Sequence, residues 1–97
     1  MEIEKIKTEI RKILKEELKD LPYKFFFFGS RVAGTASPRS DLDVGVEGEV
    51  SIPKEKLLSI KSRIEAIPTL YQIDLVDFAL ISEEFKKVAK QHIEEIE

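Results

Sequence analysis

Apolar residues recur at intervals of three and four along the first eighteen positions, which is the spacing of one helical face. This stripe consists of Ile3, Ile6, Ile10, Ile13, Leu14 and Leu18. The helix is expected to end before Pro22, because a proline drives the preceding residue out of the α region. The same spacing predicts a second helix from Pro53 to Pro68, with the stripe Leu57, Leu58, Ile60, Ile64 and Ile67. A last helix is predicted after Ser82, with the inner stripe Phe85, Val88, Ala89, His92, Ile93 and Ile96.

Three other stretches have the composition and periodicity of β-strands. Residues 23–28 (YKFFFF) are short and aromatic, which predicts a buried, central strand. Residues 41–46 place apolar side chains at every second position, and residues 71–78 (YQIDLVDF) form the third predicted strand. A short helix is predicted at residues 30–35. The element order is therefore αβ(α)βαβα, an α+β fold in which helices pack on a small mixed sheet.

Composition limits the classes of protein that fit. The 97 residues are expected to form a single domain, residues 1–97. The net charge of −3 gives no overall attraction to nucleic acid or anionic membranes, so strong binding to either is not expected. The chain has no cysteine, which excludes disulfides and thiolate metal sites. A charged N-terminus and the lack of a run of about 20 apolar residues predict a cytoplasmic protein without a signal peptide or membrane span.

The candidate chemistry lies in FFFFGSRVAGTASPRSDLDVGV, residues 25–46. A strand that ends in Gly29-Ser30 and enters a short helix presents backbone N–H groups and a hydroxyl, which are suited to holding phosphate oxygens. Asp41 and Asp43 lie two apart on a strand, so both carboxylates point to one face. A divalent cation such as Mg²⁺ removes their repulsion and completes its shell with water and substrate phosphates. The stretch therefore predicts a phosphate cradle followed by a metal site, which is the equipment for moving a nucleotidyl group.

Each part of this pattern also has a plainer explanation when taken alone. Aspartates at the start of a strand and a Gly-Ser pair after one both occur without a ligand. Arg39, beside the predicted metal loop, is interpreted as a surface arginine. His92, the single histidine, has no second ligand nearby and is expected to be a partly buried helix residue. A structural domain with fortuitous aspartates therefore stays open as a third alternative.

The joint pattern resembles the signature of the nucleotidyltransferase superfamily of DNA polymerase β-like enzymes. Gly29-Ser30 is followed by ten residues and then by Asp41-Leu42-Asp43. The chain is more closely similar to the minimal nucleotidyltransferase (MNT) family of small prokaryotic proteins, and the resemblance covers essentially its whole length. The matched positions are Gly29, Ser30, Arg31, Gly34, Ser40, Asp41 and Asp43.

The resemblance implies a role for the matched residues. Asp41 and Asp43 would ligate two Mg²⁺ ions, for which Mn²⁺ is an alternative. Gly29 and Ser30 would hold the β- and γ-phosphates of an NTP, expected to be ATP. Arg31 would help to neutralise the phosphate charge, with a surface arginine as its plainer explanation.

The family also has a third carboxylate, which lies on the next strand within an apolar-Asp-apolar-apolar segment. In this chain IDLVDF supplies the segment, and Asp74 is the match, as a ligand of the catalytic metal. Asp77, three residues later, falls on the opposite face of the strand and is the competitor. Its plainer explanation is a solvated residue at the strand end.

The resemblance further implies a partner. Solitary members of the family, which lack the additional helical domain of larger relatives, are often paired with a separate helical protein of the HEPN class. The two act as antitoxin and RNase toxin, and the MNT member adenylylates the toxin. The expected activity is therefore Mg²⁺-dependent transfer of AMP from ATP to a hydroxyl of a HEPN-type toxin. The alternative is a nucleotide-binding module that neutralises its partner by occlusion, and the oligomeric state, homo- or hetero-oligomer, stays open.

Overall fold

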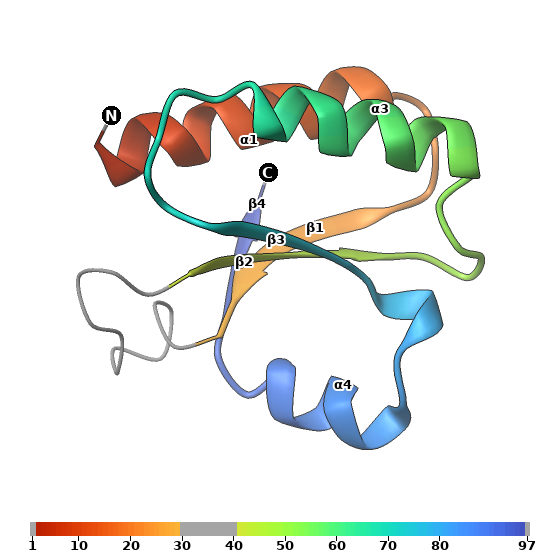
Figure 1. The fold of residues 1–97 in the computed structure, drawn as a ribbon. Coiled ribbons are helices and arrows are strands. Elements are labelled where there is room, and N and C mark those ends of the chain that lie inside the picture. The colour runs from red at the N-terminus through yellow and green to blue at the C-terminus, as the bar shows by residue number, and fades with distance from the viewer. Residues whose placement is uncertain (1, 30–40, 97) are drawn as a thin grey trace.

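The computed structural model describes residues 2–29 and 41–96. Its elements are α1 (Ile3–Glu17), β1 (Lys24–Phe28), β2 (Leu42–Glu47), α3 (Lys54–Glu65), β3 (Ile73–Asp77), the 3-10 helix η1 (Phe78–Leu80), α4 (Glu83–Ala89) and β4 (Ile93–Ile96). Helices α1 and α3 lie on one face of the sheet, and α4 lies on the other (Figure 1). The predicted α+β class is therefore confirmed, while the predicted helix at 30–35 lies outside the described residues.

The four strands form one mixed sheet in the order β3-β2-β1-β4. Strand β1 is antiparallel to both of its neighbours, and β2 and β3 are parallel, joined by α3 as their crossover helix. The phenylalanine-rich strand is thus central, as its composition predicts. The register places Phe28 of β1 opposite Asp43 of β2, and Asp43 opposite Asp74 of β3.

Alternation along β1 divides its phenylalanines between two apolar cores. Phe25 and Phe27 join the larger core, which α1 and α3 cover together with β2. Phe26 and Phe28 face the other side, where they pack with Phe78 of η1 and Ala89 of α4. The sheet therefore has a well-covered face and a lightly covered face, and the side chains on the second face include Asp43, because it pairs with Phe28.

The predicted last helix is wrong in its second half. Helix α4 ends at Ala89, and residues 93–96 form β4, which pairs with β1 through Phe28↔Ile93 and Phe25↔Ile96. The spacing of these two isoleucines fits a helical face, but it also places them on opposite faces of a strand, one in each core. Pairing with β1 wins because it satisfies the backbone groups on the second side of that strand.

Several single residues also depart from the environments that the stripes predict. His92 is exposed in the connection between α4 and β4 rather than partly buried in a helix. Val88, assigned to the inner stripe of α4, is 67% exposed, and Leu58 of α3 is 58% exposed. Of the helices that the structure describes, none has the length and apolar character to cross a membrane.

Candidate active site

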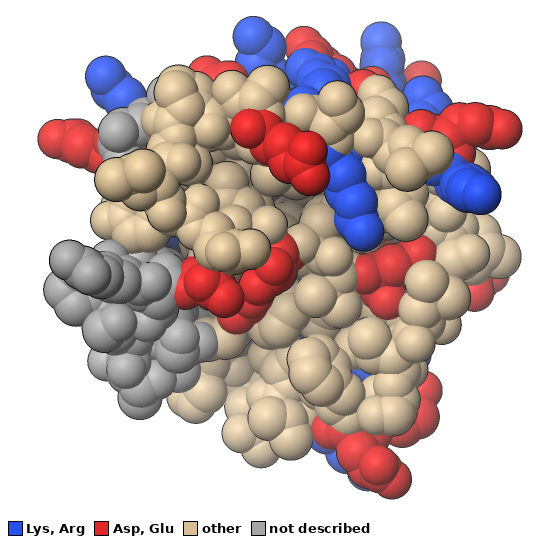
Figure 2. Space-filling model, in the orientation of Figure 1, with Lys and Arg blue, Asp and Glu red and all other residues tan. Residues whose placement is uncertain are grey.

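Three aspartates come together where β2 and β3 begin. Asp43 and Asp74 are register partners on these parallel strands, so their side chains share the lightly covered face. Asp41 stands one residue before β2, close enough to Asp74 to raise the pKa of that carboxyl group. Acidic side chains gather beside this end of the sheet in the space-filling view (Figure 2). The structure therefore brings together the three carboxylates that the sequence singles out.

Electrostatics of this group reflect partial burial and like charge. Burial raises the pKa of Asp43, and the nearby charges of Asp74 and Asp41 raise it further. Burial also raises the pKa of Asp74, and the charge of Asp41 acts in the same direction. Without metal, Asp43 and Asp74 thus hold their protons more tightly than isolated aspartates do.

Gly29 fits tightly beneath this group. It follows β1 directly and has a φ of +85°, a left-handed conformation that favours glycine. A Cβ atom placed on it would lie 2.2 Å from Oδ2 of Asp43, far inside contact distance. Glycine is therefore required here for its conformation and for the space that the Asp43 carboxylate occupies.

The donor set suits a hard divalent cation, although the carboxylates are not gathered into a cage. Within residues 2–29 and 41–96, no group of three or more His, Cys, Asp or Glu side chains is arranged to hold a metal ion. The three aspartates are coupled by charge without converging on one point. Clustered carboxylates with raised pKa values fit Mg²⁺, which takes one or two such ligands and keeps the rest of its shell for water and phosphate.

Asp77 has a structural role that the sequence does not reveal. It is 8% exposed and faces the larger core side. Its Oδ2 accepts a hydrogen bond of 2.8 Å from the Ile52 N–H, and its Oδ1 accepts one of 3.0 Å from the Ala79 N–H, which caps η1. The interpretation as a solvated strand end is therefore wrong, and Asp77 points away from the carboxylate group.

Other predicted residues lie outside the described part of the chain. These are Ser30, Arg31, Gly34, Arg39 and Ser40. The structure adds two residues that the sequence did not single out, Lys61 and Glu65 of α3, which line a cavity of about 270 Å³ together with Asp74. On the sequence they belong to the charged face of a helix, so no local signal distinguishes them from solvated residues.

A larger hollow of about 500 Å³ lies elsewhere, between β1 and β4. It is lined by Lys24, Phe25 and Phe26 at the start of β1, whereas Gly29 follows the end of that strand. Lys90 and Glu47 in its wall form an ion pair with each other at 2.6 Å. We place the candidate site at the carboxylates instead, because their mutual repulsion is the feature that a ligand would relieve.

Comparison with known proteins agrees with the class of protein that the sequence predicts. The family model described as polymerase beta, nucleotidyltransferase, matches residues 4–96. A protein of Haemophilus influenzae named as the probable protein adenylyltransferase MntA is 32% identical over 88 residues, which span 89% of this chain and 77% of that protein. A crystal structure of a toxin–antitoxin with AMP-PNP superposes with a TM-score of 0.70 at 21% identity, over 93% of this chain and 71% of that chain.

The chain belongs to the polymerase beta nucleotidyltransferase family, because the family model spans almost its whole length. The nucleotidyltransferase class predicted from the Gly-Ser and Asp-x-Asp pattern is thereby confirmed. The likeness to the toxin–antitoxin crystal structure, at its low identity, shows the shared fold.

Proposed function

We propose that this protein transfers AMP from ATP to a hydroxyl group of a partner protein. The proposal rests on one observation above all: Asp41, Asp43 and Asp74 lie at one end of the sheet, close enough to act on one another by charge, and Gly29 lies against Asp43. Its support from relatives is the name of the Haemophilus protein, a probable protein adenylyltransferase, and the AMP-PNP in the structural neighbour.

In the proposed reaction, the acceptor oxygen attacks the α-phosphorus of ATP and forms a new P–O bond. The bond from that phosphorus to the oxygen bridging it to the β-phosphate breaks, and pyrophosphate leaves. Asp74 receives the proton of the acceptor hydroxyl as the general base. Gly29 and Ser30 hold the β- and γ-phosphates, so that the leaving group stays on the β1 side.

Asp41 and Asp43 would hold Mg²⁺, and Asp74 would join them as the third ligand. When bound, the metal ions would neutralise phosphate charge and lower the pKa of the attacking hydroxyl. Arg31 would add positive charge near the phosphates. Mn²⁺, with similar oxygen preferences, would serve as a substitute.

The partner is proposed to be a toxin of the HEPN class, and this chain its antitoxin. The structural neighbour is one member of a toxin–antitoxin pair, which supports a protein partner of this kind. If the chain instead neutralised its partner by occlusion, the carboxylates would be dispensable. Replacing Asp41 and Asp43 together by Asn therefore separates the two: loss of neutralisation supports catalysis, and full neutralisation supports occlusion.

Titration calorimetry and radiolabelling test the proposal together. ATP should bind measurably with Mg²⁺ present and lose most of its affinity in EDTA, because the carboxylates repel the phosphates when no cation lies between them. Incubation with the partner toxin, α-labelled ATP and Mg²⁺ should label the toxin. Equal ATP affinity in both conditions, or label found only on this chain, would overturn the proposal.

A further inference from the structure

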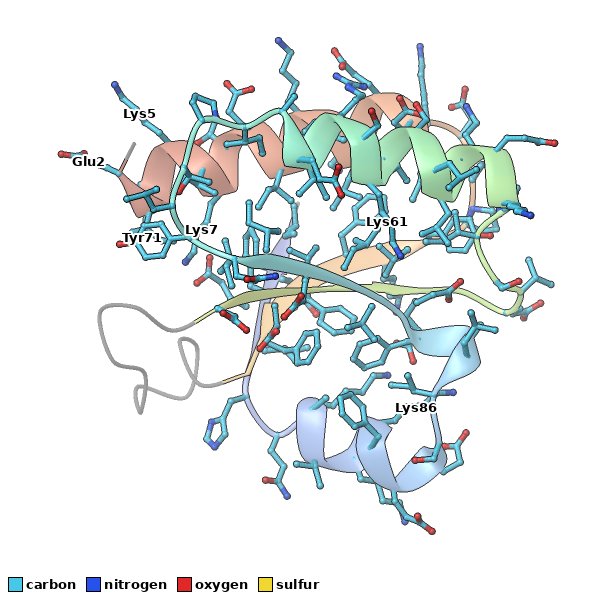
Figure 3. The ribbon with its side chains drawn as sticks, viewed as in Figure 1. Glu2, Lys5, Lys7, Lys61, Tyr71 and Lys86 are labelled. Carbon is cyan, nitrogen blue, oxygen red and sulfur yellow. The ribbon has the colours of Figure 1, made fainter. Side chains whose placement is uncertain are left out.

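A groove runs between α3 and the outer edge of β3. Its walls are Lys61, Ile64 and Glu65 on the helix and residues 72–75 on the strand, and it encloses about 270 Å³. Lys61 extends from α3 toward β3 in the stick view (Figure 3). Asp74 lies in the wall, and its carboxylate shares the opposite face of the sheet with Asp43, so a strand laid along the groove would direct alternate side chains to the two faces.

The order of the strands places this groove on the acceptor side of the site. Gly29 follows β1, Asp43 lies on β2 and Asp74 lies on β3, which is the edge strand of the described sheet. In an in-line displacement, the attacking and leaving oxygens lie on opposite sides of the phosphorus. With the leaving pyrophosphate held near Gly29, the acceptor must approach from the side of β3.

The edge of β3 offers unpaired backbone groups to an extended chain. Among the described strands, β3 pairs with β2 alone. The Leu42 N–H donates to the Gln72 carbonyl at 2.8 Å, so Gln72 directs its backbone groups toward β2. Alternation then directs the N–H and C=O groups of Ile73 and Leu75 outward, where a further strand can pair with them.

Lys61 supplies the charge that selects what binds there. It makes no ion pair with any residue in the described ranges, whereas Lys7, Arg63, Lys86 and Lys90 each do. Glu65 lies one helical turn beyond Lys61 on the same wall. The positive charge of the groove is therefore confined to the position of Lys61. An acidic side chain on the incoming segment would complement Lys61.

We propose that the groove between α3 and β3 binds the acceptor segment as an extended strand that carries an acidic side chain opposite Lys61. The inference rests on the proposed function and names the class of acceptor sequence. Because side chains alternate along a strand, the acceptor residue faces the side of Asp74, and the residues at odd offsets from it face α3. The acidic residue is therefore one or three positions from the acceptor hydroxyl.

Synthetic octapeptides with a central tyrosine provide the probe, assayed with α-labelled ATP and Mg²⁺. Each peptide carries one glutamate, placed at an odd or an even number of residues from the tyrosine and on either side of it. Matched peptides carry lysine at the same positions. We expect the odd-offset glutamate to lower KM by about two- to fivefold, the size of a partly exposed ion pair, with kcat unchanged. N-methylation of the peptide backbone should raise KM at alternate residues only, because only those N–H groups face β3.

Substitutions on α3 assign the preference to the groove. Lys61→Ala should abolish the difference between odd and even offsets, and Lys61→Glu should favour the lysine peptides. Lys54→Ala removes the same charge from the start of α3, away from the groove, and should change nothing. A preference that is absent in the wild type or survives Lys61→Ala overturns the inference, as does a set in which no peptide is labelled. Labelling of the intact partner protein tests the proposed function independently of the peptides.

Discussion

Asp74 and Asp77, two carboxylates on one short strand, have opposite environments. Asp74 shares a face with Asp43 and has a raised pKa because of burial and the neighbouring Asp41. Asp77 is buried on the other face, where its oxygens accept two backbone hydrogen bonds. At the scale of single residues, alternation along β3 therefore separates a residue poised for chemistry from one that holds the fold.

Substituting these two aspartates should produce different phenotypes. Asp74→Asn is expected to leave folding and Mg-ATP binding nearly intact but to lower transfer at least about a hundredfold, because the acceptor loses its proton-accepting carboxylate. Asp77→Asn should instead lower the free energy of unfolding by about 1.5–3 kcal/mol, since an amide cannot accept both backbone hydrogen bonds as well. Single-turnover labelling and urea denaturation measure the two effects. Reversed phenotypes would show that Asp77 is the catalytic carboxylate.

Of the three glycines that the structure describes, Gly29 is the least able to tolerate a side chain. Gly29→Ala forces an L-residue into the left-handed region, at about 1–2 kcal/mol, and drives its methyl group into the Asp43 carboxylate. We expect reduced stability and weakened Mg²⁺-dependent ATP binding, measured by urea denaturation and calorimetry. The collision can be isolated by repeating the change in an Asp43→Ala background, where the stability loss should be smaller. The same loss in both backgrounds would mean that the collision contributes nothing.

At the scale of elements, the three-residue helix η1 supplies the centre of the second core. It places Phe78, which is fully buried, edge-on against Phe26 and Phe28, with ring centroids 4.8 and 5.3 Å apart. A Cβ on Gly45 would meet both Phe26 and Phe78, so β2 must present a glycine to this cluster. Three phenylalanines and a short helix thus cover the face of the sheet on which the active-site aspartates lie.

Phe78→Ala should therefore destabilise the protein by about 3–5 kcal/mol, the cost of removing a buried aromatic ring. Phe85 of α4 is the matched control, because it contacts the same cluster while remaining 47% exposed. Phe85→Ala should cost much less in the same urea denaturation experiment. Similar losses for the two variants would indicate that α4 contributes as much to this core as η1 does.

On the scale of the whole molecule, the active-site aspartates that serve the proposed function also lower the stability of the metal-free protein. The folded protein raises the pKa values of Asp43 and Asp74, so it binds protons more tightly than the unfolded chain. Its stability without metal must therefore fall as pH rises from the ordinary aspartate pKa through these raised values, and stay lower above them. A bound divalent cation would restore that stability, because it removes the repulsion.

Asp43→Asn is expected to make the metal-free protein more stable than the wild type at pH 7, with the difference disappearing below the ordinary pKa of aspartate. Adding Mg²⁺ should raise the melting temperature of the wild type and have little effect on the variant. Thermal melts across pH, with EDTA or Mg²⁺, measure both. A wild type that is the more stable protein in EDTA at pH 7 would contradict the electrostatic account.

The sequence by itself determined the elements whose signal is local. Three patterns each predict an element from a short stretch of sequence: the helical spacing of the N-terminal stripe, the aromatic run of β1 and the alternation around Asp43. The structure has α1, β1 and β2 where these patterns predict them. The Gly-Ser and Asp-x-Asp spacing likewise identified the family, because it places several chemical groups at fixed separations along one short stretch.

Only the tertiary structure decided the features that depend on distant partners. Ile93 and Ile96 have spacing that fits a helix as well as a strand, and the free side of β1 made them β4. Nothing in the sequence near Asp77 predicts the hydrogen bonds that it accepts from the Ile52 and Ala79 N–H groups. The sequence likewise predicts a solvated Lys61, and only the packing of α3 beside the edge of β3 places that residue in the groove. Local periodicity fixes which face a side chain occupies, but its neighbours, and hence its charge and its role, are fixed by packing.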